Sequence, residues 1–162
     1  MRRVIAILLY ASLAACGTMQ NYRALDQATE QVLTASVGGT IFRLNRSSDL
    51  PNAFGKADLF GGKLDRGYAE LKFLGVNEKG ELLLSVTDIN KSSSETTMDR
   101  YGNRPAVQVQ TNVAVGSSSV PEVTRFSFDP RKQKELIIAG VRVVFVDVQP
   151  YSVSYRVKDT QK

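Results

Sequence analysis

Apolar and polar side chains alternate along most of this chain from Thr40 onward, and this pattern restricts the fold more than any other feature. The clearest example is 106–115, where valine or threonine occupies every second position from Val107 to Val115. A two-residue period is typical of antiparallel strands that bury one face. Turn signals separate the alternating stretches at short intervals. We therefore expect an all-β fold, either an antiparallel sandwich or a small barrel of about seven or eight strands.

The expected strands are short and fill one domain, which we place at residues 39–158 with a frayed end at 159–162. The sequence Asn-Glu-Lys-Gly at 77–80 predicts a hairpin turn, and 46–51 reads as a polar turn. The stretch 136–148 is dense in valine and isoleucine, so we expect it to be a central strand, with a bulge or a close approach of another segment at Gly140. The predicted strands cover 40–44, 67–76, 81–89, 106–115, 122–128, 136–148 and 151–157, with a further short strand suggested at 96–101.

The segment that precedes this domain has a different period. Tyr22, Leu25, Thr29, Val32 and Ser36 recur every three or four residues, which favours a weakly amphipathic helix or a partly ordered tether over Thr18–Gly38. A pair of glycines then ends the segment. A spacer and a helix packed across a sheet both fit this pattern.

The first sixteen residues have the order of a bacterial secretory signal: Arg2 and Arg3, an apolar run from Val4 to Ala15, and small residues before a cysteine. The apolar run has twelve residues, whereas a membrane-spanning helix needs about 20. A buried helix with a chance cysteine is the alternative. The sequence Leu13-Ala14-Ala15-Cys16, followed by Gly17, resembles the lipobox of bacterial lipoproteins at every position.

This resemblance implies a signal peptide at 1–15, cleavage before Cys16, lipid on the Cys16 sulfur and acylation of the new amino terminus. Residues 16–38 would then form a lipidated tether or helix. Two or more acyl chains hold a protein stably on a bilayer without a spanning segment. Gly17 in place of Asp resembles lipoproteins sorted to the outer membrane, so we expect a periplasm-facing anchor there rather than on the inner membrane.

The composition removes several kinds of chemistry. The chain has no histidine and one cysteine, Cys16, so Ser-His-Asp catalysis and histidine-based zinc sites cannot be built. We expect no metal and no cofactor. The net charge is +5, but the basic residues form no clustered face with stacking aromatic side chains, so nucleic acid is not an expected partner.

The polar stretch at 92–104 is the candidate recognition surface, because long loops on a rigid β scaffold often carry binding. A solvated loop without a partner is the alternative. The residues that we single out in it are Glu95, Thr96, Thr97, Met98, Asp99, Arg100 and Tyr101.

Three weaker patterns suggest other sites. Ala57–Leu64 approaches a phosphate-binding loop, but Leu64 replaces the hydroxyl residue that holds Mg²⁺. Two carboxylates that face each other could hydrolyse glycans; the candidates are Asp58, Asp65, Glu70 and Asp88. Tyr151 and Tyr155 lie four residues apart on the same face of an expected strand and could form a stacking platform for a sugar. Packing in the core or at a sheet edge is the simpler role.

We expect a non-enzymatic lipoprotein that acts as a binding or structural module of the cell envelope, with an envelope protein or glycan as partner. A carboxylate-based hydrolase acting on envelope glycans through residues such as Asp65 and Glu70 is the first alternative. A carrier that holds an apolar ligand inside a barrel is the second. Beyond the processing signal, the residues of the mature chain carry no motif that indicates a family.

Overall fold

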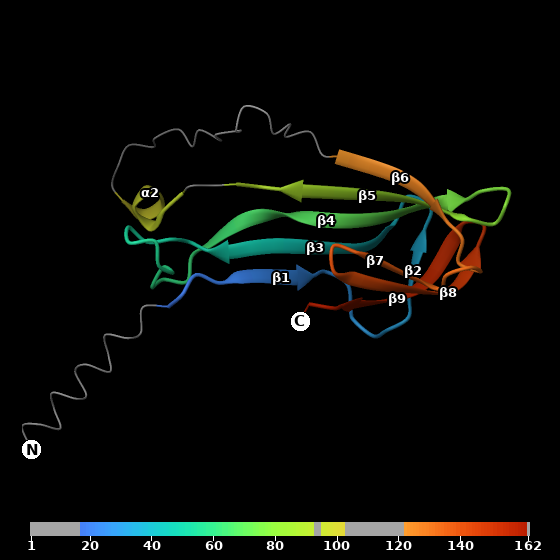
Figure 1. Cartoon of the computed structure of the whole chain (residues 1–162), viewed down its shortest axis with the longest axis horizontal. Coiled ribbons are helices and arrows are strands. Elements are labelled where there is room, and N and C mark those ends of the chain that lie inside the picture. Colours follow the sequence, from blue (N-terminus) through green and yellow to red (C-terminus); the bar gives the residue numbers. More distant parts are fainter. Residues whose placement is uncertain (1–16, 93–94, 103–121, 162) are drawn as a thin grey trace, which may run out of the picture.

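Two antiparallel sheets packed face to face make up the protein (Figure 1). The computed structural model describes residues 17–92, 95–102 and 122–161. Across these residues one sheet has five strands in the order β1-β3-β4-β5-β6, and the other has four in the order β2-β9-β8-β7. The expectation of an all-β antiparallel sandwich is confirmed. The two sheets do not close into a barrel, and the described strands number nine rather than seven or eight.

The large sheet consists of β1 (Asn21–Leu25), β3 (Thr40–Asp49), β4 (Lys63–Val76), β5 (Leu82–Asn90) and β6 (Glu122–Phe128). The small sheet consists of β2 (Leu33–Ser36), β7 (Glu135–Ile138), β8 (Val141–Gln149) and β9 (Ser152–Asp159). A short helix, α2 (Thr97–Tyr101), follows β5. The predicted hairpin at 77–80 is present, with the Asn77 amide donating to Glu81 O at 2.9 Å and Gly80 at φ 76°.

Alternating side chains of both sheets fill the space between them. Phe42 and Phe73 from the large sheet and Val143 and Val153 from the small sheet are fully buried. Burial of one such side chain contributes roughly 1.5–3 kcal/mol. Among the described residues, the buried residues of this core are Ala35, Ile41, Phe42, Leu44, Ala69, Leu71, Phe73, Leu82, Leu84, Phe128, Val141, Val143, Phe145, Val153, Tyr155 and Val157.

The helix or tether expected over Thr18–Gly38 is wrong. The segment instead forms β1 and β2, which are edge strands of different sheets. Edge strands this short bury few side chains: in β2 only Ala35 is buried, and β1 has no buried residue. Main-chain pairing with β3 and β9 holds them, so the sequence shows little of the alternation that marks an inner strand.

The single central strand expected over 136–148 is also wrong, because β7 and β8 form a hairpin here. Ile138 pairs with Val141, which leaves Ala139 and Gly140 as a two-residue turn. Both turn residues have positive φ, 51° and 75°, as a tight hairpin requires. Gly140 is therefore a turn residue and not a bulge, whereas the close approach is confirmed, because a Cβ atom at Gly140 would lie 2.8 Å from the Gln161 side chain and 2.9 Å from the Arg23 guanidinium. The β8 strand does lie inside its sheet, between β7 and β9.

Smaller differences concern three other stretches. The polar turn expected at 46–51 is mostly strand, because β3 continues to Asp49. The short strand suggested at 96–101 is the helix α2. Residues 159–161 are held rather than frayed, since the Thr160 amide donates to Gly140 O at 2.9 Å; Lys162 lies outside the described residues. The strand expected at 106–115 lies outside the described residues.

The large sheet extends well beyond the small one at the end where β3 stops and β4 starts (Figure 1). A second, smaller buried group lies there, with Leu50 and Leu64 almost inaccessible to solvent. The segment between these two leucines folds over them, and Leu50 bonds to Gly62 and Asp58 through its main chain. We call residues 50–63 and 95–102 the tip.

Candidate functional site

The residues that follow Cys16 run directly onto the tip. Cys16 itself, the expected lipidation site, lies outside the described residues. Gly17 O accepts a hydrogen bond from the Ala57 amide at 3.3 Å. Three residues later, the Gln20 amide donates to Asp49 Oδ2 at 2.9 Å, and Gln20 O accepts from the Asp49 amide at 3.0 Å. The start of the sandwich is therefore bonded to the tip and to the end of β3.

Local turn chemistry shapes the loop that carries Phe54. Pro51 and Ala57 form an isolated antiparallel bridge, and the Asn52 amide donates to Lys56 O at 2.7 Å. The Asn52 side-chain oxygen accepts from the amides of Phe54 and Lys56 at 2.9 and 3.1 Å. Asn side chains commonly close turns in this way. The loop is thus a tight turn that presents Phe54 at its apex.

The stretch Ala57–Leu64 does not form a phosphate cradle. Gly61 and Gly62 turn the chain around Asp58, whose carboxylate accepts from the Gly62 amide at 3.1 Å. Lys63 then begins β4 rather than a helix, and a phosphate loop needs the helix to direct its amides. The Lys63 ammonium bonds Asp49 at 2.5 Å and lies 3.4 Å from the ring centre of Tyr22.

The predicted recognition segment is an ordered helical turn packed on the tip loop. Thr96 caps α2: its side chain accepts from the Asp99 amide, while the Asp99 carboxylate accepts from the Thr96 amide at 2.9 Å. The Thr97 amide donates to Pro51 O at 2.8 Å, which fastens the helix to the loop. The structure therefore brings residues 95–101 together as one unit.

Within residues 95–101, the charged side chains of Glu95 and Arg100 form an ion pair with each other. Both Glu95 oxygens accept from the Arg100 guanidinium, at 2.8 Å each. This bidentate bond lowers the pKa of Glu95 and raises the pKa of Arg100. Arg100 also donates to Lys63 O at 2.9 Å. Arg100 and Glu95 therefore position α2 against β4.

Large apolar side chains cover the outside of the tip. Phe54, Leu59 and Phe60 are 87%, 84% and 82% exposed, and Met98 and Tyr101 are 55% and 58% exposed. The rings of Phe60 and Tyr101 meet edge to face with centres 6.2 Å apart. Sequence reasoning selected Met98 and Tyr101 but missed the other three. The sequence pattern that could have identified them is the presence of large apolar residues in a glycine-rich stretch without the alternation of a strand.

The proposed catalytic carboxylates do not form a facing pair. Asp65 and Glu70 lie five positions apart on β4, about 16 Å along the strand, whereas glycosidases separate their two carboxyl groups by about 5–9.5 Å. Asp65 bonds Lys91 at 2.5 Å, and this bond is the main cause of its lowered pKa. Glu70 is buried and accepts from the Thr40 hydroxyl at 3.0 Å.

The remaining carboxylates and the two tyrosines also lie apart from one another. Asp58 belongs to the tip, and Asp88 on β5 pairs with Arg46. Tyr151 is 80% exposed in the turn before β9, whereas Tyr155 is 2% exposed in the core. The two rings therefore do not form a stacking platform.

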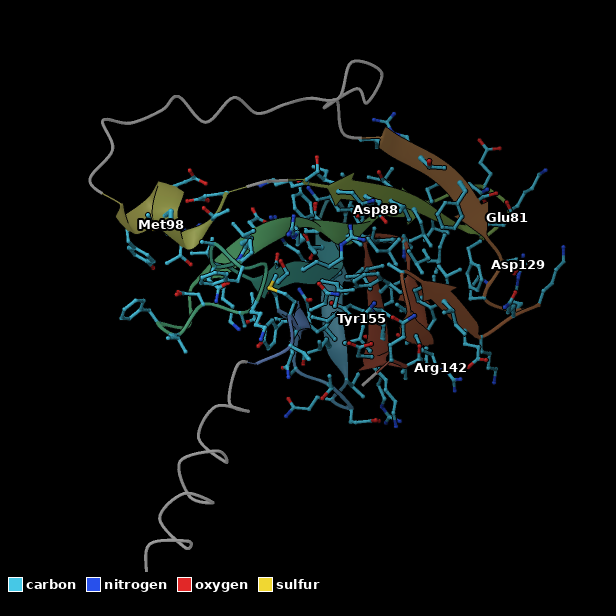
Figure 2. All side chains as sticks on the ribbon, turned by 60° about the vertical axis from the view of Figure 1, so that its left-hand side comes forward. Glu81, Asp88, Met98, Asp129, Arg142 and Tyr155 are labelled. Atoms are coloured by element: carbon cyan, nitrogen blue, oxygen red, sulfur yellow. The ribbon has the colours of Figure 1, made fainter. Side chains whose placement is uncertain are left out.

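A hollow of about 610 Å³ lies at the end of the sandwich opposite the tip. The β4–β5 and β6–β7 turns and the end of β8 surround it, and it opens at the surface rather than between closed sheets. Figure 2 shows the separation of the two ends, with Met98 at one and Glu81 and Asp129 at the other. The residues that line it include Asn77, Arg131, Lys134, Phe145, Val146 and Pro150.

No family model, curated protein or solved structure matches this chain. Among residues 17–92, 95–102 and 122–161, no helix is long and apolar enough to cross a bilayer. The same described residues contain no cluster of three or more side chains suited to hold a metal ion.

Proposed function

We propose that this protein is a bacterial envelope lipoprotein, anchored through Cys16 to the outer membrane and facing the periplasm, whose sandwich acts as a binding or structural module. The lipobox Leu13-Ala14-Ala15-Cys16 is the sequence support. The structural observation that supports the proposal is that the residues directly after Cys16, Gly17–Gln20, are few and are hydrogen-bonded to the sandwich.

Only four residues, Gly17–Gln20, separate Cys16 from β1. Fully extended, they span at most about 14 Å. Gly17 and Gln20 are both hydrogen-bonded to the folded domain, so the anchor would hold the sandwich directly on the bilayer surface by its tip end. This arrangement replaces the tether or helix expected over residues 16–38.

The end opposite the tip would then point into the periplasm. Its hollow combines an apolar floor at Phe145 with the cationic side chains of Arg131 and Lys134. Arg131 is held in place by Asp129 and by Lys79 O, to which it donates at 2.8 Å. Arg131 already pairs with Asp129, and Asp147 also lines the hollow, so Lys134 is the cation that would meet a carboxylate on a partly apolar partner surface. An envelope protein or glycan can supply such a surface.

The anchor is tested by the variant Cys16→Ser in the native host. Wild-type protein should incorporate a fatty-acid probe, lose residues 1–15 and float with membranes in a density gradient. Cys16→Ser should remain an unlabelled precursor of higher mass. Normal probe incorporation in Cys16→Ser would refute the anchor, and a free thiol on wild-type protein that retains Met1 would do the same.

The module role is tested by in-cell crosslinking followed by mass spectrometry. A photoreactive residue at Val146, at the rim of the hollow, should capture one envelope component reproducibly. The matched control is Val123 on β6, which is exposed to a similar extent (50% against 52%). Equal capture from both positions would count against the hollow as the binding surface.

A further inference from the structure

We propose that the exposed apolar side chains of the tip insert into the lipid bilayer, so that the protein holds the membrane at a second point beside its anchor. The inserting residues are Phe54, Leu59, Phe60, Met98 and Tyr101. This inference rests on the proposed function and deepens it, because it names the bilayer surface as the partner of the segment that includes residues 95–101.

The position of the anchor is the first support. Gly17 is bonded to Ala57, in the middle of the tip loop. Consecutive α-carbons are 3.8 Å apart across a trans peptide bond. The attachment point at Cys16 is therefore one residue away from the residue that bonds this loop. A lipid on its sulfur would bring the headgroups of the membrane to the same end of the molecule.

The chemistry of the exposed side chains is the second support. Single exposed apolar residues are ordinary on protein surfaces, but here three side chains more than 80% exposed lie within seven residues of each other. Met98 and Tyr101 on α2 add to them, since the Tyr101 ring contacts Phe60. Grouped apolar patches mark protein or membrane contact sites, and aromatic side chains favour the headgroup level of bilayers.

The charges at the tip are arranged in a way that suits a bilayer surface. Arg100 is paired with Glu95, and Lys63 with Asp49, so these two cations would keep their partners if the tip docked on a bilayer. Lys56 is exposed between Phe54 and Leu59, where a lipid phosphate could meet its ammonium group. Basic residues next to apolar anchors commonly contact anionic lipid in this way.

The geometry supports insertion of side chains without unfolding. Phe54 is presented by the turn that Asn52 closes, and α2 is fastened to Pro51 and Lys63 by main-chain acceptors. The tip therefore presents its apolar side chains on a preorganised scaffold. Leu50 and Leu64 beneath it are already buried, so the exposed group is not part of the core.

The chain contains no tryptophan, which allows a direct test with single-tryptophan variants. Phe60→Trp and Leu59→Trp report on the tip. The control is Tyr151→Trp, because Tyr151 is also 80% exposed and lies at the opposite end, where its carbonyl accepts from the Val37 amide ahead of β3. Each full-length variant is purified from its host and placed on vesicles of phosphatidylethanolamine and phosphatidylglycerol, with and without bromine in the acyl chains.

Bromine quenches tryptophan only at close range, so the tip variants should lose most of their fluorescence on brominated vesicles and shift their emission to the blue. Tyr151→Trp should show neither change. Equal emission from tip and control variants on vesicle-bound protein would overturn the inference. Capture of an envelope protein by a photoreactive residue at position 60, without quenching there, would overturn it as well.

The state of Cys16 is read on the same samples by mass spectrometry, so the two proposals fail separately. Acylated protein that shows no quenching at the tip retains the anchor and loses the insertion. Protein with a bare Cys16 that still shows quenching only at the tip loses the anchor and retains the insertion.

Discussion

Asp49, the last residue of β3, shows how one side chain joins three segments of the chain. Its carboxylate accepts from the Gln20 amide at 2.9 Å and from the Lys63 ammonium at 2.5 Å, while its own amide donates to Gln20 O. The side chain is 10% exposed. The entry of the chain, the end of β3 and the start of β4 therefore meet at this residue.

This geometry predicts how the stability contributed by Asp49 depends on pH. The hydrogen bond from Lys63 is the main cause that lowers the pKa of Asp49 below its ordinary value of 3.8. A carboxyl group with a lower pKa in the folded state stabilises the fold above the unfolded-state pKa, and this contribution is lost as the pH falls through the folded-state value. We expect Asp49→Asn to lower the urea midpoint at pH 7. The difference between the midpoints of variant and wild type should become smaller below about pH 4.

The measurement is urea unfolding of both proteins at pH 7, 5, 4 and 3. A gap of the same size at pH 7 and pH 3 would show that the charge of Asp49 makes no contribution. Lys63 keeps its charge throughout this range, so the change with pH reports on the carboxylate.

At the scale of elements, strands with a regular inside and outside were predictable and edge strands were not. β4, β5 and β6 fall close to the expected 67–76, 81–89 and 122–128. Apolar and polar side chains alternate along each of these strands, and each strand ends at a turn with polar residues or glycine. β1 and β2 bury too little to show a period. The β7–β8 turn escaped prediction because Ala139 adopts positive φ there, which alanine rarely does.

Gly67 controls how β4 lies against β5, and it predicts a large effect of adding one methyl group. Its φ is +94°, and a Cβ atom would lie 1.8 Å from Ile89 O. We expect Gly67→Ala to reduce the free energy of unfolding by about 2–5 kcal/mol, from backbone strain together with the clash. Urea unfolding measures the loss.

The matched control for Gly67 is Gly38→Ala. Gly38 has φ +81°, but nothing lies within 4 Å of the position that an added methyl group would take, so this variant should lose only about 1–2 kcal/mol from strain. Equal losses in the two variants would mean that β5 moves away freely and that Gly67 does not fix the approach of the two strands.

At the scale of the whole molecule, Arg23 ties the two sheets together at the end where the small sheet stops. From β1 it donates to Ala139 O at 2.7 Å, to the Gln161 side chain at 2.6 Å and to Asp159 at 3.3–3.4 Å. One guanidinium therefore joins the edge of the large sheet to the β7–β8 turn and the end of β9.

We expect Arg23→Ala to lower the free energy of unfolding by roughly 2–3 kcal/mol, because Asp159, 9% exposed, would lose its charged donor. Arg142→Ala is the control, since Arg142 is half-exposed and 3.7 Å from Glu135; it should cost less than about 0.5 kcal/mol. Chemical denaturation of the two variants decides the comparison. Losses of similar size would show that the inter-sheet bond adds no more than a surface ion pair.

The candidate site was predictable only in part, for a physical reason. The polarity of residues 92–104 marked the recognition segment along the chain. Nothing in the sequence shows that this segment meets 50–63, because the contact between Phe60 and Tyr101 joins positions 41 residues apart and depends on the path of β3 and β4. The hollow at the opposite end is likewise made by the β4–β5 and β6–β7 turns and the end of β8, which only the folded sheets bring together.

Only four residues lie between Cys16 and β1, so the connecting segment is very short. If Cys16 carries the proposed lipid, the protein would reach no further from the bilayer than the length of the sandwich, about 45 Å if the fourteen residues of β4 are taken as its measure. An anchored protein of this kind would contact only partners that lie in the same membrane or come within that distance of it. A longer connecting segment would let the sandwich reach more distant partners, but its orientation toward nearby partners would no longer be fixed.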